Sequence, residues 1–295
     1  MSDMIKEYLD SLEKALSGSD PATVRDALGD AEEHLRTALD AASIESPDVP
    51  EDELIRGIIE DYGTPEEVAD AYRRIEKYST PVLAGKKKNG NRSAAARFFG
   101  VMVDPRAYGA MFYGLFALVT GIIYFTWAVT GLSLSVGLAV MIFGIPFFGL
   151  FLLSVQGLML VEGRIIEALS GIRMPRRPVA SRKGLNVWQK FVALVKDKRS
   201  WSSILYMILQ LIFGIVHFTV TISLLAFSAS FILRPILEYT FEIPMMHISG
   251  IEYWTPIWAM PLTVLIGAVL LVTTLHAARG MTRLHARWAK FMLVR

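Results

Sequence analysis

Residues 104–130 read DPRAYGAMFYGLFALVTGIIYFTWAVT, and this apolar stretch decides the fold. After Arg106 the chain carries no charged residue until Glu162. A helix of roughly 20 apolar residues crosses the hydrocarbon core of a bilayer, and the uncharged run is long enough to cross it twice. The sequence therefore predicts two consecutive membrane helices, at about 108–130 and 137–160.

The same pattern returns 93 residues further along the chain. The segment DPRAY at 104–108 aligns with DKRSW at 197–201. In this alignment Asp104 matches Asp197, Arg106 matches Arg199 and Tyr108 matches Trp201. The segment GIIYFT at 121–126 likewise aligns with GIVHFT at 214–219. Hydrophobicity alone does not require Asp, Arg or Gly at matching positions, so we interpret the pattern as an internal repeat. It predicts a second pair of membrane helices, at about 203–232 and 255–277.

Composition separates an acidic head from a basic membrane body. The first 80 residues hold 21 acidic and 8 basic residues, although the whole chain has a net charge of +2. The chain contains no cysteine, which excludes disulfides, thiolate metal sites and cysteine nucleophiles. The N-terminal segment lacks the basic and apolar regions of a secretory signal. We expect a small cytoplasmic helical domain at 1–78, a basic linker at 79–97 and a transmembrane domain at 98–295.

Helix signals in the head predict four short helices. Asp20 before Pro21 and Thr64 before Pro65 are typical of helix starts, where a side-chain oxygen accepts from free N–H groups and proline fits the first turn. Glu66 and Glu67 then face the positive end of the helix dipole. With the membrane part, the predicted fold class is all-α: a helical head followed by a four-helix transmembrane bundle of two tandem hairpins.

Three motifs of the head are similar to a known family. MIKEYLDSLEKAL at 4–16, DAEEH at 30–34 and DYGTPEEVA at 61–69 resemble the HAAS family of small helical signalling modules. The resemblance implies a protein contact surface and no catalysis. It also implies a cytoplasmic signalling partner, either a PadR-like regulator or a kinase.

Loop charges predict the orientation in the membrane. Ten basic residues lie between 163 and 202 against two acids, and the tail after 278 is also basic, so both segments belong inside under the positive-inside rule. The loops at 131–137 and 234–254 belong outside. Lys86-Lys87-Lys88 in the linker favours contact with anionic lipids over nucleic acid. We expect a multi-pass cell membrane protein with both termini in the cytoplasm.

The membrane part also resembles a family, the sensor domain of prokaryotic membrane signalling proteins. The resemblance runs from Phe98 to about Phe291 and rests on DPRAY at 104–108, GIIYF at 121–125 and EGR at 162–164. Two amphipathic stretches, 161–169 and 281–293, have the apolar and cationic faces of helices that lie along a membrane surface. The resemblance implies a four-helix module that responds to a signal.

Candidate ligand-binding residues lie in the second half. His217 is ionisable within an apolar helix and aligns with Tyr124 in the repeat, so the two are predicted to meet, as a ligand site or as a hydrogen-bonded contact between helices. Met245, Met246, His247 and Trp254 form a second candidate in the outer loop, where three soft ligands do not complete a metal site. The predicted membrane-interface residues are Arg106, Tyr108, Arg199 and Trp201.

No arrangement of residues predicts nucleophilic, two-carboxylate or metal-assisted catalysis, and no cofactor is expected. We therefore expect a non-enzymatic sensor that relays a membrane signal through its head. A homo-oligomer is among its expected forms. One alternative is a transport or channel component built from the repeated hairpins. Another is a membrane-embedded lipid-modifying enzyme, which the scarcity of carboxylates and histidines near the interface disfavours.

Overall fold

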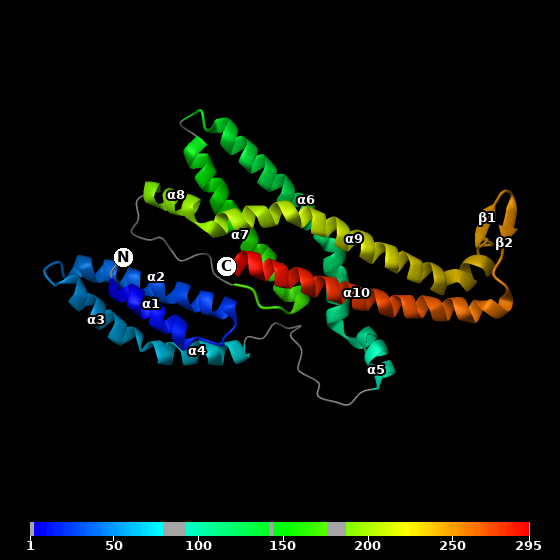
Figure 1. Ribbon diagram of the computed structural model, residues 1–295, viewed down its shortest axis with the longest axis horizontal. Helices are drawn as coiled ribbons and strands as arrows, with labels where there is room; N and C mark the ends of the chain where they lie inside the picture. Colours follow the sequence, from blue (N-terminus) through cyan, green and yellow to red (C-terminus); the bar gives the residue numbers. More distant parts are fainter. Residues whose placement is uncertain (1–2, 79–92, 142–143, 176–186, 295) are drawn as a thin grey trace. The chain divides into compact units, whose positions relative to one another are not determined.

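The computed structural model describes residues 3–78, 93–141, 144–175 and 187–294. It is mostly helical, with an N-terminal helical region and four long apolar helices (Figure 1), which confirms the predicted fold class. Contacts divide the chain into two compact units. The first comprises Met1–Ala84, Ala128–Tyr206 and Trp288–Arg295, and the second comprises Gly85–Trp127 and Met207–Arg287.

The four predicted helices of the head are present. They are α1 (Asp3–Ala15), α2 (Pro21–Glu45), α3 (Glu51–Tyr62) and α4 (Pro65–Tyr78). The carboxylate of Asp20 accepts a hydrogen bond of 2.9 Å from the Ala22 N–H, as expected for an N-cap. Thr64 and Glu67 exchange hydrogen bonds at the start of α4, in the reciprocal pattern of a capping box. Local sequence signals thus determine both helix starts.

The head has a hydrophobic core of its own. Leu12, Leu16, Leu35 and Ile55 are buried together between the helices. The Tyr8 hydroxyl donates to the Gly63 carbonyl at 2.8 Å. Burial, reinforced by repulsion from Tyr62, Glu66 and Glu67, raises the pKa of Tyr8 to about 12. The core explains why the apolar residues of the head recur at helical spacing.

Four helices are long and apolar enough to cross a membrane within the described part of the chain. They are α6 (Pro105–Leu138), α7 (Gly144–Ser170), α9 (Lys198–Tyr239) and α10 (Met260–Val294). The prediction of four such helices is confirmed, but its boundaries were too short. The segments 161–169 and 281–293 are not separate interfacial helices, because α7 and α10 continue through them without a break. The loop predicted at 131–137 is likewise helical to Leu138.

Three short helical segments were not predicted. They are α5 (Ala94–Phe99), the 3-10 turn η1 (Gly100–Val103) and α8 (Val187–Lys196). Ser93 caps α5 by accepting from the Ala96 N–H at 3.2 Å. Of the predicted linker, residues 79–92 lie outside the described residues.

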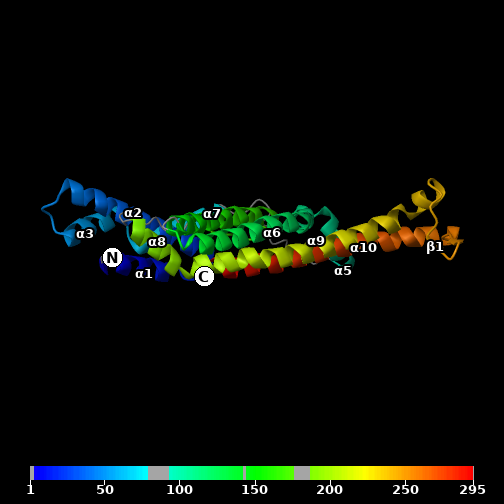
Figure 2. The same cartoon turned by 90° about the horizontal axis from the view of Figure 1, so that it is seen from above.

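A two-stranded ribbon connects α9 to α10. Strands β1 (Met246–Ile248) and β2 (Ile251–Tyr253) pair antiparallel, and a 3-10 turn η2 (Ile257–Ala259) leads into α10. Ser249 and Gly250 both have positive φ angles, of 52° and 83°, as a tight I′-type hairpin turn requires. Figures 1 and 2 show α9 and α10 side by side, with the ribbon at their shared end. Within this hairpin Ser228 donates to the Gly267 carbonyl at 2.9 Å.

The direction of α6 in the second unit differs from the prediction. A Cβ atom at Gly121 would lie 2.9 Å from the Gln210 carbonyl oxygen, and one at Gly214 would lie 2.4 Å from that of Ala117. Residue numbers therefore rise along α6 as they fall along α9, so the two helices are antiparallel. The predicted topology requires them to be parallel. Apolar composition does not encode the direction of packing, and glycines permit close approach of two helices in either direction.

Candidate functional site

A buried carboxylate joins the loop between α9 and α10 to the end of α9. Glu238 lies in the last turn of α9, and its side chain is only 2% exposed. One carboxylate oxygen lies 2.5 Å from Arg234 Nε and accepts from the Thr255 hydroxyl at 2.7 Å. The other accepts from the Thr255 N–H at 3.0 Å. Arg234, Glu238 and Thr255 join α9 to the segment that follows the ribbon, and we call them the outer clamp after the predicted outer loop.

The predicted residues of the outer loop lie on or beside the ribbon. Met245, Met246, His247 and Trp254 are all exposed to solvent. Met246 and His247 are neighbours on β1, so their side chains point to opposite faces of the strand. They therefore do not converge on one ion. No group of three or more metal-ligating His, Cys, Asp or Glu side chains occurs among the described residues.

His217 is buried in the second unit, with a neighbour that sequence reasoning missed. Its ring lies 5.4 Å from the ring of His285 on α10 and 6.2 Å from that of Tyr113 on α6. The sequence predicted that His217 meets Tyr124, whereas the tyrosine beside it in the structure is Tyr113. Tyr113 and Tyr124 are about 16 Å apart along α6 at 1.5 Å per residue. The antiparallel packing of α6 therefore brings Tyr113 to His217. No signal in the sequence marks His285 beyond its place on an amphipathic helix.

The four predicted interface residues lie at the starts of α6 and α9. Asp104 accepts from the Arg106 N–H at 3.1 Å, and Asp197 accepts from the Arg199 N–H at 3.0 Å. Tyr108 donates its hydroxyl proton to Met102 O at 2.8 Å, and Trp201 donates its indole N–H to Val195 O at 2.9 Å. The two aspartates thus cap the starts of α6 and α9. Contact of the arginines and aromatic rings with lipid headgroups stays a prediction.

A polar contact joins the head to the C-terminal end of α10, within the first unit. Lys290 Nζ lies 2.6 Å from Asp20 Oδ2 and 2.7 Å from Oδ1. Arg25 on α2 donates to the Leu293 carbonyl, one of the groups that a helix end leaves without an internal partner. Asp20 thus caps α2 and pairs with Lys290 at once. These residues form the head–tail contact.

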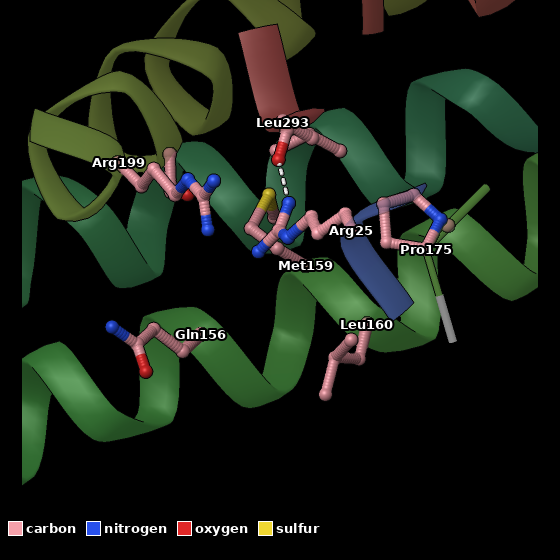
Figure 3. A pocket seen from close by; sticks show the side chains of 9 residues that line it. Arg25, Gln156, Met159, Leu160, Pro175, Arg199 and Leu293 are labelled. Carbon is pink, nitrogen blue, oxygen red and sulfur yellow. Dashed lines mark hydrogen bonds between the residues drawn. The ribbon is translucent and has the colours of Figure 1, made fainter. Parts of the chain in front are cut away.

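Figure 3 shows the pocket beside this contact. Arg25 and Arg199 line it together with Gln156, Ser203 and apolar side chains. Its volume is about 40 Å³, which holds one or two water molecules, whereas ligand pockets commonly measure about 300–1,000 Å³. Burial, followed by repulsion from Arg199, lowers the pKa of Arg25 to about 10, although Asp26 and Asp197 oppose the shift. Arg25 therefore remains cationic at neutral pH, and the pocket is too small for a metabolite.

A larger apolar pocket of about 290 Å³ lies elsewhere in the first unit. Its lining joins Leu132 and Val136, near the predicted outer loop, to Phe191 and Trp201, near the predicted cytoplasmic loop. Helices that cross one bilayer in the predicted order would separate these pairs. Like the direction of α6, this pocket disagrees with the topology that loop charges predict.

These features define a class of helical protein with four candidate membrane spans and an N-terminal helical domain. A family model described as "Putative sensor" matches residues 113–293, which is more than half of the chain, and the chain belongs to this family. A second model, HAAS, matches residues 7–71. Both resemblances seen in the sequence are thus confirmed. A search of curated proteins found no match, and neither did a search of solved structures.

Proposed function

We propose that this protein is a non-enzymatic membrane sensor whose head relays a membrane or envelope signal to a cytoplasmic protein. The single observation that carries the proposal is the head–tail contact. A relay needs a physical link between the membrane part and the head, because a basic linker alone transmits little. Lys290 and Arg25 supply that link at the end of α10. Membership of the sensor family and the HAAS match support the same role.

The relay requires two arrangements of the protein that the signal favours differently. The outer clamp joins the two ends of the loop between α9 and α10, whereas Lys290 and Leu293 are near the C-terminal end of α10. A change at the clamp that shifts or rotates α10 would therefore reach the residues that hold the head. Partly exposed ion pairs contribute about 0.2–1 kcal/mol, so the head–tail contact is weak enough to be switched.

An internal repeat is part of the proposal. Three contacts recur at an offset of 93 residues: the aspartate caps, the aromatic hydrogen bonds to residues 102 and 195, and the close approaches at Gly121 and Gly214. Repetition of the same local contacts is expected when two hairpins descend from one ancestor. The matching contacts support the repeat beyond the match in residue types.

We propose that both termini face the cytoplasm, on the strength of the basic loop at 163–202. The antiparallel contact of α6 and α9 argues for a different arrangement, so the topology needs its own test. Because the chain has no cysteine, Gly137→Cys near the end of α6 and Gln189→Cys in α8 report the predicted outer and cytoplasmic sides without background. An impermeant maleimide added to intact cells is expected to label position 137 alone. Labelling of position 189 would contradict the proposed topology.

The function is tested by crosslinking in native membranes, followed by identification of the captured proteins. We expect a cytoplasmic regulator, of the PadR-like kind, or a kinase to be captured by the intact chain. A variant that lacks residues 1–78 should lose it. Capture that is the same with and without the head would overturn the relay.

Anionic lipids and a second copy of the chain are further proposed partners.

A transport component is the second candidate, favoured by buried polar side chains in α9. Gln210, His217, Thr221 and Ser228 are all buried in this apolar helix. Polar residues at such positions line paths in transporters as well as joining helices. Flux through vesicles that is lost on His217→Ala would favour transport. A lipid-modifying enzyme has no comparable observation in its support.

A further inference from the structure

The ribbon has two chemically different faces. In its register Met246 pairs with Tyr253, His247 with Glu252, and Ile248 with Ile251. Paired residues of an antiparallel ladder lie on the same side, and successive residues alternate. One face therefore carries only apolar side chains, namely Met246, Ile248, Ile251 and Tyr253. The other face carries the pair His247 and Glu252.

The apolar face has no cover within the described residues. Its four side chains remain about half exposed, at 50% for Met246, 49% for Ile248, 59% for Ile251 and 49% for Tyr253. A two-stranded ribbon is marginal in water without an apolar surface to pack against. The apolar face therefore requires a partner.

The position of the ribbon identifies that partner. It connects two candidate membrane spans, and the outer clamp holds Thr255, two residues after β2, against the last turn of α9. A three-residue strand spans about 10 Å. The ribbon is therefore held within about that distance of the helix ends. The fourth candidate span begins at Ile257, four residues after β2, so the ribbon lies beside the start of a span, where amphipathic segments meet the headgroup region.

The residues around the ribbon have the composition of a membrane interface. Tyr253, Trp254 and Trp258 are exposed, and these aromatic types concentrate at the boundary between lipid headgroups and acyl chains. Ile257 adds a further exposed apolar side chain next to Trp258. Between residues 240 and 258 the charged residues are Glu242 and Glu252, and Glu252 lies on the opposite face of the ribbon.

We propose that the apolar face of the ribbon inserts into the headgroup boundary of the adjacent leaflet, with His247 and Glu252 toward water. The ligand of the ribbon is then the lipid surface itself. The inference rests on the proposed membrane location, but it is independent of the head's partner and of which side of the membrane is outside. The outer clamp would transmit a change in lipid packing to α9 and α10.

Site-directed spin labels test this proposal in the full-length protein. Ile251→Cys places a label on the apolar face, and Glu252→Cys places a matched label one residue away on the opposite face. Ile248→Cys gives a second apolar position on the other strand. Each variant is reconstituted in nanodiscs of phosphatidylethanolamine and phosphatidylglycerol. The accessibility of each label is measured to oxygen, which partitions into lipid, and to a water-soluble nickel chelate.

We expect a higher oxygen-to-nickel accessibility ratio at positions 248 and 251 than at position 252. Equal ratios dominated by nickel at all three positions would overturn the proposal, because the ribbon would then stand in water. Dipolar broadening between labels at position 251 would overturn it as well, because a second copy of the chain would then cover the face. Neither result depends on whether the head captures a regulator, so failure here is distinct from failure of the relay.

Discussion

Replacing Glu238 with alanine should release the outer loop from α9. The carboxylate of Glu238 is buried, lies 2.5 Å from Arg234 and accepts two hydrogen bonds from Thr255. Removing one partner of a buried ion pair costs about 3–5 kcal/mol, because the other charge stays buried without compensation. Arg234 is itself mostly buried, at 12% exposure of its side chain. The pair lies in the last turn of α9 and not in a deep core, so the loss should fall at the lower end of this range.

Hydrogen–deuterium exchange measures the release directly. A loss of about 3 kcal/mol corresponds to about a 150-fold faster exchange, since each 1.4 kcal/mol is a factor of ten. The Thr255 amide, which Glu238 binds, should show the increase up to the rate of an unprotected amide. The double variant Arg234→Ala, Glu238→Ala should recover part of the lost stability to unfolding, because no unpaired charge remains, but not the protection of the Thr255 amide, since Glu238 is its acceptor.

The matched control is Glu252→Gln, which removes a carboxylate from the exposed ribbon of the same loop. Surface substitutions of this kind change stability by less than about 0.5 kcal/mol. Exchange at Thr255 should therefore change by less than about threefold in the control. If Glu238→Ala also left this exchange unchanged, the outer clamp would not hold the loop and the reasoning would be wrong.

Three further predictions concern the contacts of each unit. Lys290→Gln should weaken the head–tail contact by about 0.5–1 kcal/mol. Distance measurements should then show a two- to fivefold larger fraction of undocked heads, whereas Arg287→Gln on the same helix should leave this fraction unchanged. Gly121→Leu should destabilise the protein in detergent by about 1–3 kcal/mol, because its Cβ would meet a backbone oxygen at 2.9 Å, whereas Gly157→Leu enters open space and should be neutral. The free energy of unfolding of the head should be constant below pH 10 and fall by about 1–2 kcal/mol toward pH 12, because folding favours the neutral phenol of Tyr8. This range is below the full 2.7 kcal/mol of a two-unit shift because the neighbouring glutamates are screened by solvent. A flat profile to pH 12, given by chemical denaturation of residues 1–78, would contradict the last prediction.

Features set by neighbours in the sequence were predictable. Asp20 with Pro21 and Thr64 with Pro65 start helices through contacts within three residues, and apolar length alone gives four candidate spans. The turn at Ser249-Gly250 was a local signal of the same kind that was overlooked. It could have predicted the ribbon between two short apolar runs.

Features set by distant contacts were not predictable. Arg234 and Glu238 counted only as loop charges, because their burial depends on Thr255, 17 residues further on. His285 joins His217 only through the packing of α10 on α9. The direction of α6 is of the same kind, since hydrophobicity gives the length of a helix and not its neighbours. The candidate residues Met246 and His247 lie on opposite faces of β1, which required the register of the ribbon, and their role as ligands stays a prediction.

The central claim is that a change at the outer clamp reaches the head. It is tested most directly by distance distributions between spin labels at Thr37→Cys on α2 and Phe291→Cys on α10, with and without Glu238→Ala, in nanodiscs. Both positions are exposed and the chain has no other cysteine. We expect that opening the outer clamp broadens the distribution or shifts it to longer distances. An unchanged distribution, in a variant whose outer loop exchanges faster, would contradict it.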